Sequence, residues 1–194
     1  DDGGNTWQVQ ASGTRSYLNA VHFTNRQTGW AAGTNGVLLH TADAGHNWTL
    51  HLLSSNVYLV DVYFLNHQIG WVLGNRGTLF KTSDSGQTWD TLMVPVPGNK
   101  FLSSVFFVNE QTGWALGWDK TLLKTDNGGQ TWSSVVPVNA GFLKSVFFIN
   151  EQLGWVTGDQ GRIFRTNNGG QSWITQASGT SVSLQKIQFL NTQT

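Results

Sequence analysis

A short stretch that ends in tryptophan recurs along this chain at a nearly constant spacing. One copy is Thr82–Trp89, with the sequence T-S-D-S-G-Q-T-W. The closing tryptophans are separated by 41, 41, 43 and 41 residues, and they are Trp7, Trp48, Trp89, Trp132 and Trp173. A glycine–tryptophan pair keeps the same spacing at Trp30, Trp71, Trp114 and Trp155. A period of roughly 40–50 residues is typical of a β-propeller, in which four-stranded blades stand around an axis.

Each repeat contains four segments with the composition of strands, which we name A to D in chain order. In the third complete repeat the predicted strands are Leu102–Asn109, Gly113–Gly117, Thr121–Thr125 and Thr131–Val136. The same pattern predicts an all-β propeller with complete antiparallel blades at about 18–53, 58–94, 101–138 and 142–177.

The two ends of the chain supply only parts of blades. Residues 1–11 contain a hairpin and a predicted D strand, and residues 182–194 contain a predicted A strand that begins near Leu184. We therefore expect residues 1–194 to form one propeller repeat domain that is a piece of a larger propeller or array, or a partner in an assembly. Unpaired strand edges also favour self-association through the unfinished end blades.

The composition limits the classes of partner. Only 11% of the residues are charged, against about 25% in an average domain, and the formal net charge is zero. Neither nucleic acid nor an anionic membrane is favoured by such a balance. No apolar run approaches the ~20 residues of a membrane span. Uncharged polar residues supply the polarity instead, which suits an extracellular, cell-surface or otherwise exported protein.

A short polar side chain lies at the same place in every tryptophan-closed hairpin, at Asp2, Asp43, Asp84, Asn127 and Asn168. Asp and Asn both accept hydrogen bonds from backbone amides of their own turn, so we interpret these residues as structural. The glycine two residues further on is expected to have a positive φ. Calcium needs six to eight oxygen ligands, whereas each hairpin offers one carboxylate or none, so we expect no metal and no cofactor.

Partners of propellers usually bind where the B–C turns and the D–A connections gather on one face. Candidate partner-binding residues in these segments are Trp118, Asp119, Arg76, Asp159, Tyr58 and Phe101. Trp118 stands out because the equivalent turn positions hold Thr34, Asn75 and Asp159, so the repeat does not explain an aromatic residue there. A polar face with aromatic residues suits a protein segment or a carbohydrate.

The hairpin resembles the Asp-box, or BNR repeat, of sialidases, xyloglucanases and sortilin-type receptors. The whole third repeat, with V-F-F-V-N, G-W-A-L-G, L-L-K-T and D-N-G-G-Q-T-W, is similar to the photosystem II stability/assembly factor family. This resemblance covers the full chain and implies a propeller, usually of seven blades, that assists assembly by binding protein. Asn127 and Asn168 depart from the family's aspartate, which argues against any role that needs the charge.

The leading hypothesis is a noncatalytic scaffold for protein–protein binding, as in the assembly factors. An extracellular structural or adhesive repeat protein is the alternative. A glycan-binding or glycoside-hydrolysing Asp-box protein is the third hypothesis. It is disfavoured because the only two glutamates, Glu110 and Glu151, occupy one repeated turn position, and no carboxylate pair across a cleft is indicated.

Overall fold

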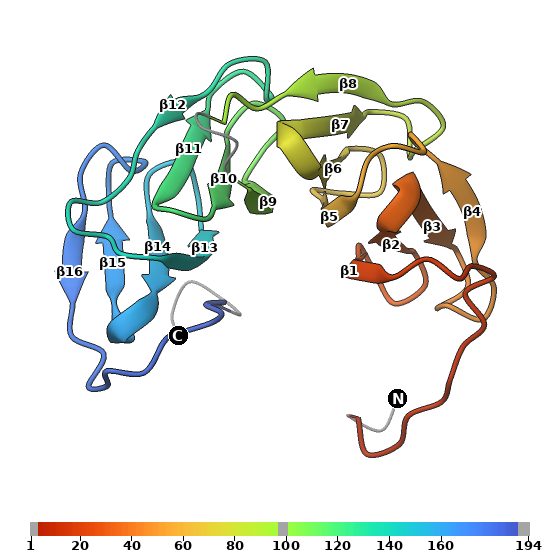
Figure 1. The fold of residues 1–194 in the computed structure, drawn as a ribbon, viewed down its shortest axis with the longest axis horizontal. Coiled ribbons are helices and arrows are strands. Elements are labelled where there is room, and N and C mark those ends of the chain that lie inside the picture. The colour runs from red at the N-terminus through yellow and green to blue at the C-terminus, as the bar shows by residue number, and fades with distance from the viewer. Residues whose placement is uncertain (1–3, 97–100, 190–194) are drawn as a thin grey trace.

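The computed structural model describes residues 4–96 and 101–189. These residues form four antiparallel sheets of four strands, which stand side by side along an open arc (Figure 1). The prediction of an all-β propeller with four-stranded antiparallel blades is confirmed.

The strands follow chain order within every blade, so consecutive strands pair. The first blade contains β1 (Leu18–Phe23), β2 (Gly29–Gly33), β3 (Val37–Thr41) and β4 (Thr49–Leu52). The second contains β5 (Leu59–Phe64), β6 (Gly70–Gly74), β7 (Thr78–Thr82) and β8 (Asp90–Met93). The third contains β9 (Leu102–Phe107), β10 (Gly113–Gly117), β11 (Thr121–Thr125) and β12 (Ser133–Ser134). The fourth contains β13 (Leu143–Phe148), β14 (Gly154–Gly158), β15 (Ile163–Thr166) and β16 (Ile174–Gln176).

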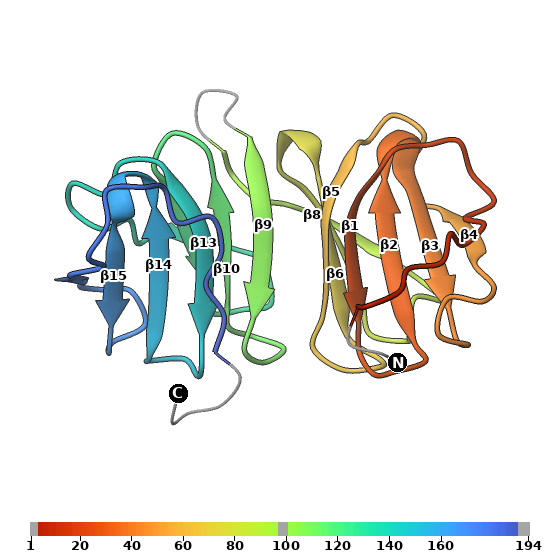
Figure 2. The ribbon, with the colours of Figure 1, turned by 90° about the horizontal axis from the view of Figure 1, so that it is seen from below.

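The first strand of each blade lies on the inside of the arc and the last strand lies on the outside (Figure 1). Seen from the side, the strands run from one edge of the arc to the other, so turns of one kind collect on one edge (Figure 2). Short 3₁₀ turns join the second strand to the third in three blades: η1 (Thr34–Gly36), η2 (Asn75–Gly77) and η4 (Asp159–Gly161).

The blades are joined by a layer of stacked aromatic rings, which we call the junction layer. Trp71 of β6 stacks on Phe107 of β9, with ring centroids 3.6 Å apart and planes 3° apart, and neither residue has exposed surface. Trp114 stacks on Phe148 in the same way, at 3.5 Å. The glycine that starts each second strand makes room for this layer, because a Cβ on Gly113 would collide with the Phe107 ring. Each Trp–Phe pair therefore comes from two neighbouring blades and holds them together.

One predicted strand is shorter than expected, and two predicted end segments are not strands. The predicted D strand Thr131–Val136 is reduced to Ser133–Ser134, and the segments around residues 4–11 and 184–189 are not strands. Leu184–Phe189 nevertheless takes the place of a next A strand: Leu184 N donates to Gly158 O at 3.0 Å, and Phe189 lies 4.4 Å from the Trp155 ring. A strand needs a hydrogen-bonded neighbour, and no B strand lies beside this segment in the part of the chain that the structure describes.

Candidate functional site

The turns between the second and third strands lie on one edge of the arc, which we call the turn face (Figure 2). In every blade the first residue of this turn donates its backbone N–H to the carbonyl of an aromatic residue just before the first strand. The bonds are Thr34 N to Tyr17 O, Asn75 N to Tyr58 O, Trp118 N to Phe101 O and Asp159 N to Phe142 O, at 2.8–2.9 Å. These four aromatic residues are 53–81% exposed, so a row of aromatic side chains borders the turns.

Glycine ends this turn in three blades, at Gly36, Gly77 and Gly161, and has a positive φ in each. The connection that follows the fourth strand packs directly over it. A Cβ on Gly36 would collide with Ser54 O, and one on Gly77 would collide with Val94 O. Leu53 N and Val94 N also donate to the carbonyls of Gly36 and Gly77, at 3.0 and 2.8 Å.

The third blade lacks both features of this packing. Lys120 stands where the other blades have glycine, and it has a φ of 60° after Asp119 with a φ of 53°. Five residues after its closing tryptophan the third blade has Pro137, where the first two blades have the donors Leu53 and Val94. Proline has no N–H to donate. The connection of the third blade therefore cannot close over its turn as the others do.

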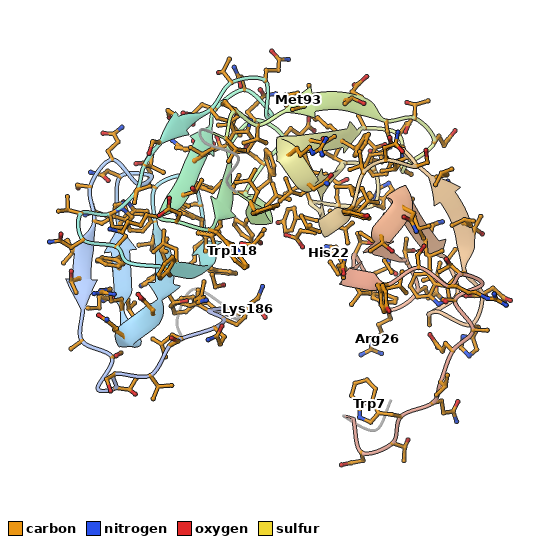
Figure 3. All side chains as sticks on the ribbon, viewed as in Figure 1. Trp7, His22, Arg26, Met93, Trp118 and Lys186 are labelled. Atoms are coloured by element: carbon orange, nitrogen blue, oxygen red, sulfur yellow. The ribbon has the colours of Figure 1, made fainter. Side chains whose placement is uncertain are left out.

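A hollow of about 380 Å³ lies beside this turn, at the junction between the third and fourth blades. It is lined by Ser103, Trp118, Phe142, Leu143 and Lys144. Trp118 is 68% exposed, and its ring lies edge to face with that of Phe101, with centroids 6.3 Å apart. Figure 3 shows Trp118 in the space between these two blades.

The six predicted partner-binding residues lie in three different blades. Phe101, Trp118 and Asp119 meet at the turn of the third blade. Arg76 and Tyr58 belong to the second blade, where Arg76 takes a left-handed conformation with φ 58°. Asp159 belongs to the fourth blade, where its Oδ1 accepts from Phe142 N at 3.2 Å and forms a 2.6 Å ion pair with Arg162 Nη1.

A second polar cluster lies on the inner strands, and the sequence did not indicate that its residues come together. Asp61 of β5 accepts hydrogen bonds from Val62 N at 3.0 Å and Val105 N at 2.8 Å, the latter across the blade junction. Its carboxyl is enclosed by protein, although the residue keeps some exposed surface, and burial raises its pKa to about 6. His22, Tyr63 and Lys186 line the same hollow of about 230 Å³. The Asp61 oxygens are already used as acceptors, so the carboxyl is a clamp between blades.

The ring groups of this inner cluster are tied into the fold in the same way. Tyr63 Oη donates to Phe107 O at 2.7 Å, and burial raises the pKa of this phenol to about 12. Burial also lowers the pKa of His22, whose ring lies 5.2 Å from that of Tyr63.

The tryptophan-closed hairpins differ between the two halves of the chain. In the second blade Asp84 accepts from Thr88 Oγ1 at 2.6 Å and from Thr88 N at 2.9 Å, and these bonds lower its pKa to about 2. In the third blade Asn127 Oδ1 accepts from Thr131 N at 2.8 Å, and Asn127 Nδ2 donates to Thr131 Oγ1 at 2.8 Å. The amide thus reproduces the loop without a charge, because the threonine hydroxyl turns from donor to acceptor.

The other predicted hairpin residues are placed as follows. Asp43 accepts from Asn47 N at 2.9 Å, and Asn168 Oδ1 accepts from Ser172 N at 2.9 Å, while Asp2 lies outside the described residues. Trp48, Trp89, Trp132 and Trp173 each lie edge to face against the Phe of their own blade's first strand, and Trp7 is 88% exposed. The glycines two residues after the Asp or Asn all have positive φ: Gly4, Gly45, Gly86, Gly129 and Gly170.

Sequence reasoning also missed the threonine that begins each hairpin. Thr82 Oγ1 donates to Asp84 Oδ1 at 2.8 Å and accepts from Gly86 N at 2.9 Å, and the residue is 1% exposed. Its repetition at Thr41, Thr125 and Thr166 was the available signal. In the described ranges no group of three or more His, Cys, Asp or Glu residues could hold a metal ion. No helix within those ranges is long and apolar enough to cross a membrane.

Known propellers share this architecture. The chain superimposes on a YCF48 bound to a D1 peptide with a TM-score of 0.68 and 19% identity, over 89% of this chain and 57% of that one. YCF48 from Cyanidioschyzon merolae gives a TM-score of 0.68 and 20% identity, over 91% and 61%. A GH74 enzyme from Niastella koreensis gives 0.61 and 18%, over 81% and 30%. At these identities the likeness shows the fold alone, and the chain spans about three fifths of the YCF48 structures.

Sequence comparison gives the family. No curated protein matches the chain. The family model described as photosynthesis system II assembly factor YCF48 matches residues 1–57 and 50–191, which together cover nearly the whole sequence. The chain therefore belongs to the YCF48 family of photosystem II assembly factors.

Proposed function

We propose that this chain is a noncatalytic scaffold that binds a protein segment on its turn face, in the manner of an assembly factor. The observation that carries the proposal is the third turn, where Trp118 is 68% exposed beside a hollow of about 380 Å³. Large exposed aromatic side chains next to a hollow are typical of residues that dominate binding energy at protein interfaces.

A segment of the D1 protein is the first ligand to test, because a YCF48 of the same fold is bound to a D1 peptide. The test is fluorescence anisotropy of labelled D1 peptides titrated with the chain and with the double variant Trp118→Ala/Arg76→Ala. We expect binding that the double variant weakens by at least about tenfold, or about 1.4 kcal/mol. Equal binding by the double variant to every retained peptide would remove the turn face as the site.

The absence of catalysis is part of the proposal, since GH74 enzymes share the fold. Three observations support it. The Asp61 oxygens accept backbone hydrogen bonds. Asp159 is paired with Arg162. Glu151 Oε1 accepts from Asn109 Nδ2 at 2.6 Å, in the turns on the opposite edge. Hydrolysis of any member of a fluorogenic glycoside panel by the chain would overturn this part.

Location, carbohydrate binding and self-association remain proposals of lower rank. The low charge content favours an exported compartment, and the aromatic row would also suit a carbohydrate. Phe23 of β1, which is 42% exposed and has no Trp from a preceding blade stacked on it in the described residues, would allow association between copies. Fractionation of the source cells, a glycan array and sedimentation of the chain would test these three points.

A further inference from the structure

We propose that the hollow beside Trp118, which we call the anchor pocket, receives one aromatic or large aliphatic side chain of an acidic protein segment. This inference rests on the proposed function and adds the chemistry of the partner. Its residues are Ser103, Trp118, Phe142, Leu143 and Lys144.

The turn that borders the anchor pocket departs from the repeat. In the first two blades the backbone of the connection lies over the turn glycine and is held by a hydrogen bond to its carbonyl. In the third blade Lys120 replaces the turn glycine, and Pro137 replaces the residue whose N–H donates to it in the first two blades. Two consecutive non-glycine residues with positive φ, Asp119 and Lys120, are also an uncommon turn sequence. Asp119 and Lys120 directly follow Trp118, which lines the pocket.

The lining selects an apolar side chain. Trp118, Phe142 and Leu143 present apolar surface, and Trp118 and Phe142 are 68% and 56% exposed. Phe101, which is 60% exposed, meets Trp118 edge to face and extends the apolar surface beyond the pocket. A hollow of about 380 Å³ lies near the lower end of the range of ligand pockets, ~300–1,000 Å³. One side chain with its flanking backbone therefore fits better than a large cofactor.

The charges around the anchor pocket favour an acidic segment. Lys144 lines the pocket and Lys120 lies in the turn beside Trp118. The neighbouring carboxylate of Asp159 is paired with Arg162 at 2.6 Å, so that acid is already balanced. Asp119 is the remaining acid of these two turns, against the cations Lys120 and Lys144. Acidic residues on either side of the apolar anchor would pair with these lysines and increase the association rate.

The test uses labelled synthetic peptides in which one central phenylalanine is flanked by Asp and Glu. Two matched peptides carry Ala in place of Phe, or Lys in place of the acids. Fluorescence anisotropy with the whole chain is expected to give binding of the acidic Phe peptide at least about tenfold tighter than of either matched peptide. Equal affinity for all three peptides, or no binding of any of them, would overturn the proposal.

Variants separate the pocket from the rest of the turn face. We expect Trp118→Ala and Lys144→Glu each to weaken the acidic Phe peptide by about tenfold or more. Tyr17→Ala, which removes the equivalent exposed aromatic residue of the first blade, serves as the matched control and should leave the affinity unchanged. Circular dichroism and the thermal midpoint of each variant report whether it is folded. If folded Trp118→Ala binds as the unaltered chain does, the pocket is not the site.

The D1-peptide titration distinguishes this inference from the proposed function. Binding of a D1 peptide that is lost in Arg76→Ala but kept in Trp118→Ala would leave the turn face as a protein-binding surface and overturn the anchor pocket. Lys120→Gly gives an independent check without removing an aromatic residue, because it removes one of the two lysines that would pair with the acidic residues of the segment. We expect this variant to weaken the acidic Phe peptide several-fold, and unchanged binding would contradict the charge pairing at this turn.

Discussion

The junction layer and the turn face differ in how closely equivalent positions of the four blades resemble one another. At three junctions a tryptophan stacks on a phenylalanine of the next blade, with centroids 3.6 Å apart for Trp71–Phe107, 3.5 Å for Trp114–Phe148 and 4.9 Å for Trp30–Phe64. On the turn face, the positions equivalent to Trp118 hold Thr34, Asn75 and Asp159. Residues that pack between blades are fixed by their two neighbours, whereas a turn residue faces solvent and is free to differ.

This difference indicates which residues of a repeat protein have a structural role and which can have a functional one. A residue that recurs in every blade is explained by stacking one blade on the next. A residue that departs from the repeat carries information of its own, as Lys120 and Pro137 do. Changes in the junction layer should therefore alter stability, and changes at departures should mainly alter binding or pH dependence.

The largest effect is expected for Phe107→Ala in the junction layer. Phe107 has no exposed surface, stacks on Trp71 and lies edge to face with Trp132 at 6.3 Å. Loss of such a ring costs about 3–5 kcal/mol in the free energy of unfolding, because a cavity remains. Urea unfolding followed by circular dichroism measures this loss.

Phe23→Ala is the matched control for Phe107→Ala. Phe23 holds the equivalent position in β1 but is 42% exposed, and its ring lies edge to face with that of Trp48. We expect less than half of the loss seen for Phe107→Ala. Equal losses for the two variants would mean that stacking between blades contributes little.

A smaller effect is expected at Asp61, a departure that lies on a junction. Burial raises the pKa of this carboxyl to about 6, from an ordinary value near 4. The folded state therefore prefers the protonated form. The stabilising contribution is complete below pH ~4 and is lost as the pH rises through about 6, a change of at most about 3 kcal/mol.

Asp61→Ser tests this pH dependence with a residue from the repeat itself. Ser145 holds the equivalent position in the fourth blade, and its Oγ accepts from Ile187 N at 3.2 Å. His22, Tyr63 and Lys186 line the same hollow, so urea midpoints at several pH values should be compared for the variant and the unaltered chain. We expect the loss of stability between pH 4 and 7 to shrink in the variant; an identical pH profile would show that Asp61 is not its source.

Gly77→Ala tests whether the connection must pack over the turn. Gly77 has a φ of 78°, and its new Cβ would collide with Val94 O, so we expect a loss of about 1–3 kcal/mol in the free energy of unfolding. Lys120→Gly in the third blade should change it by less than about 1 kcal/mol, because relief of the left-handed conformation offsets the entropy of glycine. Similar losses of unfolding free energy in both variants would show that the turn of the third blade packs no differently from the turn of the second.

The period of the sequence was sufficient to predict the four-stranded blades. It could not predict that Ser133–Ser134 would be the only residues of the third blade's last strand, because that depends on how Pro137 and the following connection pack. The surroundings of Asp61 could not be predicted, because its partner Val105 N comes from the next blade and a period does not reveal which backbone groups meet there. Of the residues discussed for the anchor pocket, the sequence singled out Trp118 as a departure from the repeat. The effect of Lys120 and Pro137 on the packing of the third turn could be recognised only in the structure.

The smallest effect is expected where the hairpins themselves differ, between Asp84 and Asn127. Hydrogen bonds from Thr88 lower the pKa of Asp84 to about 2, and those from Asn47 lower that of Asp43 to about 2. The stability that these carboxylates contribute is present above pH ~4 and is lost as the pH falls through about 2. Both carboxylates are open to solvent, so the change is small.

The double variant Asp43→Asn/Asp84→Asn gives these hairpins the amide that Asn127 and Asn168 already have. The urea midpoint of this variant should decrease less than that of the unaltered chain as the pH falls from 4 to 2. If the urea midpoint of the variant decreases as much as that of the unaltered chain, the charge in these hairpins does not contribute to stability, and the four loops are equivalent despite their sequences.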